Sequence, residues 1–129
     1  MADDPEWFVQ ILDLQLQRNP EMLAGLRRQG IDDDAPVRLE FFYLAPGEAE
    51  ARDLVAFLRQ QTDYQVQAFE RRAGIDESIP WLVVGMTQPT PVSLDLVNAW
   101  TEWMVAAGAE QGPCAFDGWG AQAASSPGP

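Results

Sequence analysis

The chain has no histidine and no lysine, and its single cysteine is Cys114. Histidine is the usual general base and metal ligand, and lysine is needed for Schiff-base chemistry. Their absence therefore excludes Ser-His-Asp and Cys-His sites and leaves no plausible set of zinc ligands. One cysteine permits no internal disulfide, and no basic residue stands beside Cys114 to activate its thiol. We predict no catalytic residue, no metal site, no cofactor, and a buried, inert Cys114.

Long apolar runs are also missing. None approaches the ~20 residues of a membrane span, and the first residues, MADDPEW, are acidic where a secretory signal is basic. With 129 residues, 47% of them apolar, the chain is long enough to build the core of one domain. We expect a cytoplasmic protein that makes no contact with a membrane.

Positive charge is scarce. Twenty acidic residues face eight basic ones, all arginine, for a net charge of −12. A chain of this charge is repelled by phosphate backbones, so we predict no direct contact with nucleic acid. An acidic surface of this kind favours binding to a basic protein partner. The alternative interpretation is that the acidity only keeps the protein soluble.

Hydrophobic periodicity predicts an α+β fold. Two short helices or one kinked helix are expected over residues 5–29, and period-two alternation in VRLEFFYL and YQVQAFER indicates two strands. PWLVVGMT indicates a third strand, central in the sheet, and CAFDGWG a fourth. Two further helices are expected over residues 47–61 and 92–107.

The order of these elements is that of a ferredoxin-like, split βαββαβ domain: one four-stranded antiparallel sheet, two helices on one face, and an N-terminal helical extension. We predict the extension over residues 1–35, the domain over 36–120 and a disordered tail over 121–129. The core between sheet and helices is expected to contain Leu54, Leu58, Val83, Leu96, Trp100 and Phe116.

The opposite face of this sheet would expose Phe42, Leu44 and Met86, which is too much apolar surface for a solvated layer. Two alternatives remain for what packs against this face: the N-terminal helices, which we favour, or a second copy of the chain. The protein is accordingly expected to be a monomer or a homodimer.

The stretch FDGWG, Phe116 to Gly120, places two aromatic rings, an acid and two glycines close to the end of the sequence. Phe116 is expected to point toward the helices. Asp117-Gly118 is a turn or bulge signal, because glycine tolerates positive φ and the carboxylate accepts backbone hydrogen bonds. Trp119 is either a structural clamp, which we favour, or an exposed contact for a partner.

FDGWG and two longer stretches, EFFYLAPGEAEARDLVAFLRQQTDYQV and PWLVVGMTQPTPVSLDLVNAWTEWMVAAGA, resemble the family of regulators of ribonuclease E activity B (RraB). The resemblance covers residues 37–120, and its most specific motif is Phe116, Asp117, Gly118, Trp119 and Gly120. It implies a ferredoxin-like fold. It also implies a small acidic cytoplasmic protein that binds the endoribonuclease and inhibits it without being an enzyme.

From charge and aromatic content, candidate contacts with a protein partner are the acidic run together with the sheet end: Asp32, Asp33, Asp34, Asp117 and Trp119. The predicted function is that of a non-catalytic, protein-binding regulator. One alternative is an immunity- or antitoxin-like protein that neutralises a basic effector, and a remote one is a small-molecule enzyme.

Overall fold

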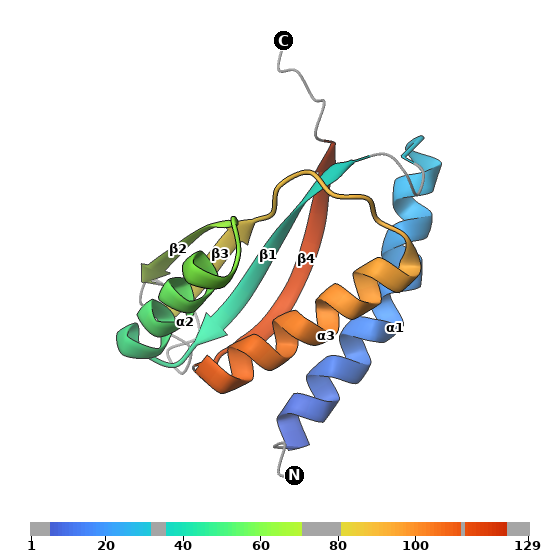
Figure 1. Ribbon diagram of the computed structural model, residues 1–129. Helices are drawn as coiled ribbons and strands as arrows, with labels where there is room; N and C mark the ends of the chain where they lie inside the picture. The colour runs from blue at the N-terminus through green and yellow to red at the C-terminus, as the bar shows by residue number, and fades with distance from the viewer. Residues whose placement is uncertain (1–5, 32–35, 71–80, 112, 124–129) are drawn as a thin grey trace.

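The computed structural model describes residues 6–31, 36–70, 81–111 and 113–123. In this part of the chain three helices and four strands follow one another (Figure 1). They are α1 (Glu6–Arg28), β1 (Val37–Ala45), α2 (Glu48–Gln61), β2 (Gln65–Glu70), β3 (Trp81–Met86), α3 (Leu94–Gln111) and β4 (Ala115–Ala123).

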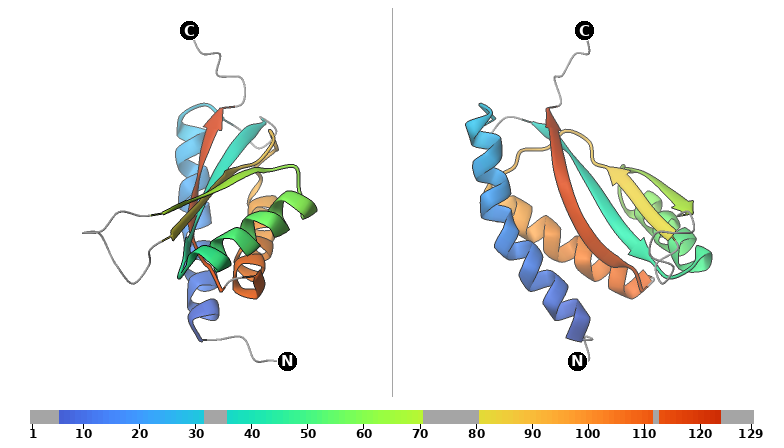
Figure 2. Two further views of the ribbon diagram at one scale, coloured as in Figure 1. Left: turned by 90° about the vertical axis from the view of Figure 1, so that its left-hand side faces the viewer. Right: turned by 180° about the vertical axis from the view of Figure 1, so that it is seen from behind.

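The four strands form one sheet in the order β2-β3-β1-β4, and every neighbouring pair is antiparallel. Helices α2 and α3 pack against the same face of this sheet (Figures 1 and 2). The α+β class and the four-stranded antiparallel sheet are confirmed. The finer assignment to the ferredoxin-like fold stays a prediction.

The core lies between the sheet and the helices. Alternate residues of β1 point into it, as the period-two pattern predicts, and they are all buried: Val37, Leu39, Phe41, Tyr43 and Ala45. The predicted core residues Leu54, Leu58, Val83 and Phe116 are buried as well. Trp100 is half-buried against this cluster.

Leu96 was expected in the core, and this expectation is wrong because its side chain is 53% exposed. Val92, Leu96, Trp100 and Met104 recur every four residues in the sequence, and this row predicts a buried Leu96. Four residues turn a helix by about 400°, so such a row drifts by about 40° at each step and leaves the buried face. The row that α3 buries runs through Val97, Thr101, Met104 and Val105, which places Leu96 one position off it.

The N-terminal helical segment is one continuous helix that contains Pro20. It packs mainly against α3 and the edge strand β4, and the rear view shows it running beside β4 instead of across the sheet (Figure 2). The expectation that it covers the second face is therefore wrong for most of that face. Within the described residues, α1 reaches it at the β4 side, where Met22 and Phe42 line one groove.

Strand β4 contains a bulge at the FDGWG motif. Phe42 pairs with Gly118 while Tyr43 pairs with Phe116, so Asp117 is an extra residue without a partner on β1. The extra residue places Phe116 and Trp119, three positions apart, on the same helix-covered face. The strand continues through residues 121–123, which were predicted to belong to the tail, and residues 124–129 lie outside the described residues.

Gly118 has a φ of +147°, a conformation that disfavours any residue with a Cβ. No atom lies within 4 Å of the position that a Cβ would occupy there, so an alanine would be strained by its backbone alone. We expect Gly118→Ala to lower the free energy of unfolding by about 1–2 kcal/mol in urea titrations. Gly120→Ala is the matched control, because that site is equally open and has no positive φ; equal losses in the two variants would contradict this account of the bulge.

Cys114 is fully buried, as predicted, and its Sγ lies 3.6 Å from the carbonyl oxygen of Glu50. Burial, together with the charges of Glu50 and Asp53, raises the pKa of the thiol from 9.0 to about 12. At pH 8 this pKa lowers the thiolate fraction by about 1,000-fold. We expect thiol reagents to modify the native protein at least about 100-fold more slowly than the urea-unfolded protein; comparable rates would contradict the buried placement.

Candidate protein-binding surface

A single asparagine joins three elements beneath the FDGWG motif. Asn19 of α1 is fully buried, and its Oδ1 accepts a hydrogen bond of 2.9 Å from Nε1 of Trp119 on β4. Its Nδ2 donates to Oδ1 of Asn98, at 2.8 Å, and to Oγ1 of Thr101, at 3.1 Å, both on α3. A buried polar group is stable only when it is satisfied in this way, so the amide fixes the position of α1.

A second amide from α1 supports the bulge itself. Nε2 of Gln15 donates to the carbonyl oxygen of Asp117 at 3.3 Å, and the Gln15 side chain is buried. Gln15 and Asn19 stand four residues apart and therefore lie on one face of the helix. We call Gln15, Asn19, Asn98, Thr101 and Trp119 the amide latch, because together they hold α1 against β4 and α3.

The two rings of the motif belong to an aromatic cluster inside the domain. Phe116 makes edge-to-face contacts with Tyr43 and Trp100, with ring centroids 5.3 and 6.0 Å apart. Trp119 meets Trp100 in the same geometry at 6.3 Å, and only 7% of Trp119 is exposed. Edge-to-face packing of this kind adds to the stabilisation that burial alone provides.

On the outside of the motif, a groove of about 230 Å³ runs between α1 and the bulge. The exposed side chains of Arg18, Met22 and Asp117 stand along it, and Phe42, Gly118 and Trp119 complete its lining. We call this the motif groove. Within the described part of the chain, no side chain forms an ion pair or a hydrogen bond with the Asp117 carboxylate.

The structure thus separates the residues that the sequence grouped together. Phe116 and Trp119 point inward, whereas Asp117 points to solvent at the bulge. Asp32, Asp33 and Asp34 lie outside the described residues, so their distance from Asp117 is not defined. Their role as partner contacts stays a prediction.

Two negative findings apply to the described residues alone. No group of three or more histidine, cysteine, aspartate or glutamate side chains is placed to hold a metal ion. No helix among them is both long and apolar enough to cross a membrane.

Sequence reasoning missed the two amides of α1. Of the two expected arrangements, two short helices or one kinked helix, the structure has a single helix that continues through Asn19 and Pro20. The available signal was periodicity: Gln15 and Asn19 occupy the helical stripe that Ile11, Leu12 and Leu23 share, where apolar residues are expected. A polar residue in such a stripe must find a buried partner, and the tryptophan of FDGWG is that partner.

These features define a class of protein: an α+β domain whose described residues form three helices and one four-stranded antiparallel sheet, with a buried amide bonded to an indole at the edge strand. The sequence model of a family described as regulator of ribonuclease activity B, RraB, matches residues 16–121. The chain belongs to this family. The match begins inside α1 and so includes Asn19, and no curated protein sequence matches the chain.

Removing the central amide of the latch tests its importance. Asn19→Ala would leave the indole N–H of Trp119 without its buried acceptor, and it would remove the donor that the side-chain oxygens of Asn98 and Thr101 share. We expect a loss of about 2–4 kcal/mol in the free energy of unfolding, measured in urea. Gln17→Ala on the exposed side of the same helix should change it by less than about 0.5 kcal/mol. If both substitutions have the same small effect, the latch does not hold α1 in place.

Proposed function

We propose that this protein is a non-catalytic regulator that binds a ribonuclease directly and lowers its activity, with ribonuclease E as the target. The observation that carries the proposal is the family match, which extends over residues 16–121 and includes the whole described sheet except its last two residues. A regulator that binds an enzyme needs a complementary surface and no reaction chemistry of its own. This agrees with a chain that lacks histidine and lysine.

Charge indicates what kind of surface the partner presents. The net charge of −12 favours a basic face on the ribonuclease, because opposite fields accelerate association and orient the encounter. This attraction weakens as salt shortens the screening length from ~10 Å at 0.1 M to ~3 Å at 1 M. The association rate with the ribonuclease should therefore fall steeply over that range of salt concentration.

The motif groove is the contact surface that we assign to this partner. It combines a carboxylate at Asp117, which is exposed and has no partner among the described residues, with the exposed apolar side chain of Met22 and the half-buried Phe42. Apolar anchors surrounded by charge are the usual composition of a protein-binding site. Trp119 supplies the floor of the groove. Asp32, Asp33 and Asp34, which lie outside the described residues, are proposed as further acidic contacts with the same partner.

The proposal is tested by mixing the full chain with purified ribonuclease E from the same cell and following cleavage of a fluorescent RNA substrate. We expect the cleavage rate to fall in a saturable way as the protein is added. Binding of the two proteins should be visible by interferometry at low salt. Undiminished cleavage and no binding at 0.1 M salt would refute ribonuclease E as the target.

Reversing one charge at the groove should separate recognition from folding. We expect Asp117→Lys to slow association with the ribonuclease about fivefold or more while the melting temperature stays within about 2 °C, because the side chain is exposed. Asp53→Lys on α2 is the matched control, since it changes the net charge equally at an exposed site away from the groove. Equal slowing by both variants would mean that only net charge matters.

A further inference from the structure

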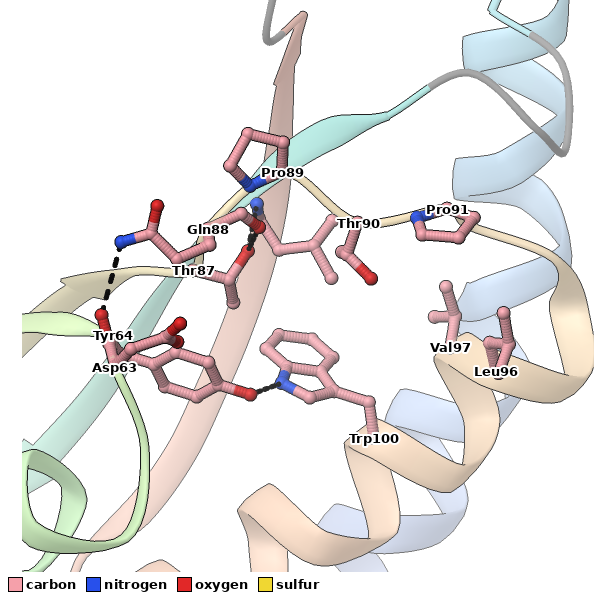
Figure 3. A pocket seen from close by; sticks show the side chains of 11 residues that line it. Asp63, Tyr64, Thr87, Gln88, Pro89, Thr90, Pro91, Leu96, Val97 and Trp100 are labelled. Atoms are coloured by element: carbon pink, nitrogen blue, oxygen red, sulfur yellow. Dashed lines mark hydrogen bonds between the residues drawn. The ribbon is translucent and has the colours of Figure 1, made fainter.

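A second cavity lies on the helix-covered side of the sheet, between the start of α3 and the segment that follows β3. It has a volume of about 360 Å³, within the range of ligand sites. Figure 3 shows the rings of Tyr64 and Trp100 along one side and the 87–91 segment along the other. Leu96, whose exposure the sequence did not predict, also lines this cavity beside Val97.

The walls of this cavity are held in place by hydrogen bonds. The backbone of Thr90 exchanges two hydrogen bonds with Val37, and Oγ1 of Thr87 accepts one from the backbone N–H of Leu39 at 3.0 Å. On the other side, Nε1 of Trp100 donates to Oη of Tyr64 at 3.1 Å. A cavity with fixed walls binds a guest without the entropic cost of ordering itself first.

The charge that faces the cavity is negative. Asp63 is the only charged residue among those that line it, and within the described residues no basic group pairs with its carboxylate. Burial raises the pKa of Tyr64; its hydrogen bond from Trp100 lowers that pKa, and the charge of Asp63 raises it further. The field of the carboxylate therefore reaches the Tyr64 hydroxyl, which remains protonated at neutral pH.

These features exclude two kinds of guest. An anion would face the carboxylate of Asp63, and the first turn of α3 carries its own acid, Asp95, and is capped by Oγ of Ser93. A purely apolar side chain would remove water from the hydroxyl of Tyr64 without replacing its hydrogen bonds. A flat cation on an apolar stem has neither disadvantage, because it stacks on aromatic rings and pairs with carboxylates.

We propose that the cavity lined by Tyr64, Trp100 and Asp63 is a binding site for the guanidinium group of an arginine side chain presented by a protein partner. The methylene stem of that arginine lies against Leu96 and Val97, and its guanidinium lies over the aromatic rings with its N–H groups directed at the Asp63 carboxylate. The complementarity rests on the acidic chain as a whole as well as on this one residue, since the net charge is −12.

The inference rests on the proposed function, because the partner that presents the arginine is the ribonuclease. One contact between aromatic rings connects the cavity to the motif groove. Trp100 lines the cavity on one side and makes an edge-to-face contact with Trp119 on the other. A partner seated at the groove can thus have a second anchor on the far side of the same aromatic cluster.

The preference for a cation is tested with small probes on the full-length protein. The indole N–H resonance of Trp100, assigned with Trp100→Phe, reports on the cavity because this group donates to Tyr64. We expect N-acetyl-arginine amide to shift this resonance in a saturable way. N-acetyl-citrulline amide, which is a neutral isostere, and N-acetyl-leucine amide should bind several-fold more weakly. Equal binding of the neutral probes, or no shift with the arginine probe, would overturn the proposal.

Two variants connect the probe to the partner. Asp63→Asn should weaken binding of the arginine probe about two- to fivefold, as expected for an exposed ion pair. Asp95→Asn, at an exposed acid on α3 that does not line the cavity, should leave it unchanged. If the wild type binds the ribonuclease and Asp63→Asn binds it equally well, the arginine site is refuted while the proposed function stands. If the arginine probe binds but the ribonuclease does not, the site stands and the proposed function fails.

Discussion

The position of α1 depends on one buried amide. The fully buried Asn19 side chain offers two donors and an acceptor, and Asn98, Thr101 and Trp119 satisfy them from two other elements. A group of this kind is costly when it is unpaired, so alternative packings of the helix are penalised far more than a purely apolar contact would penalise them. Hydrophobic burial brings α1 to the domain, and the amide selects where it docks.

The aromatic cluster behind the latch gives both candidate surfaces a common rigid base. Trp100 contacts Phe41, Phe116 and Trp119 in edge-to-face geometry, and it donates to Tyr64. The motif groove lies on one side of this cluster, and the cavity lined by Tyr64 and Trp100 lies on the other. Because this base is already ordered, binding at either site does not require the ligand to order it first, and this favours fast and specific association.

Local pattern predicted most of the elements, because alternation in β1 and the helical repeats of α2 and α3 each depend on a single buried face. It failed where a contact joins distant parts of the chain. The docking of α1 at β4 depends on hydrogen bonds across about one hundred residues, and no local rule pairs Asn19 with Trp119. The motif itself was recognisable, and burial agrees with the favoured structural interpretation of Trp119. The cavity at Tyr64 and Trp100 was missed because its walls come from four separate segments.

The bulge in β4 gives position 117 an unusual freedom. The fold requires that one extra residue be present there, since its removal would turn Trp119 to the opposite face of the sheet and disconnect it from Asn19. The backbone carbonyl of Asp117 accepts the hydrogen bond from Gln15, and the Asp117 side chain is exposed to solvent. We therefore expect position 117 to tolerate substitution of its side chain but not deletion of the residue. A substitution at position 117 changes the charge displayed beside the groove without altering the scaffold that displays it.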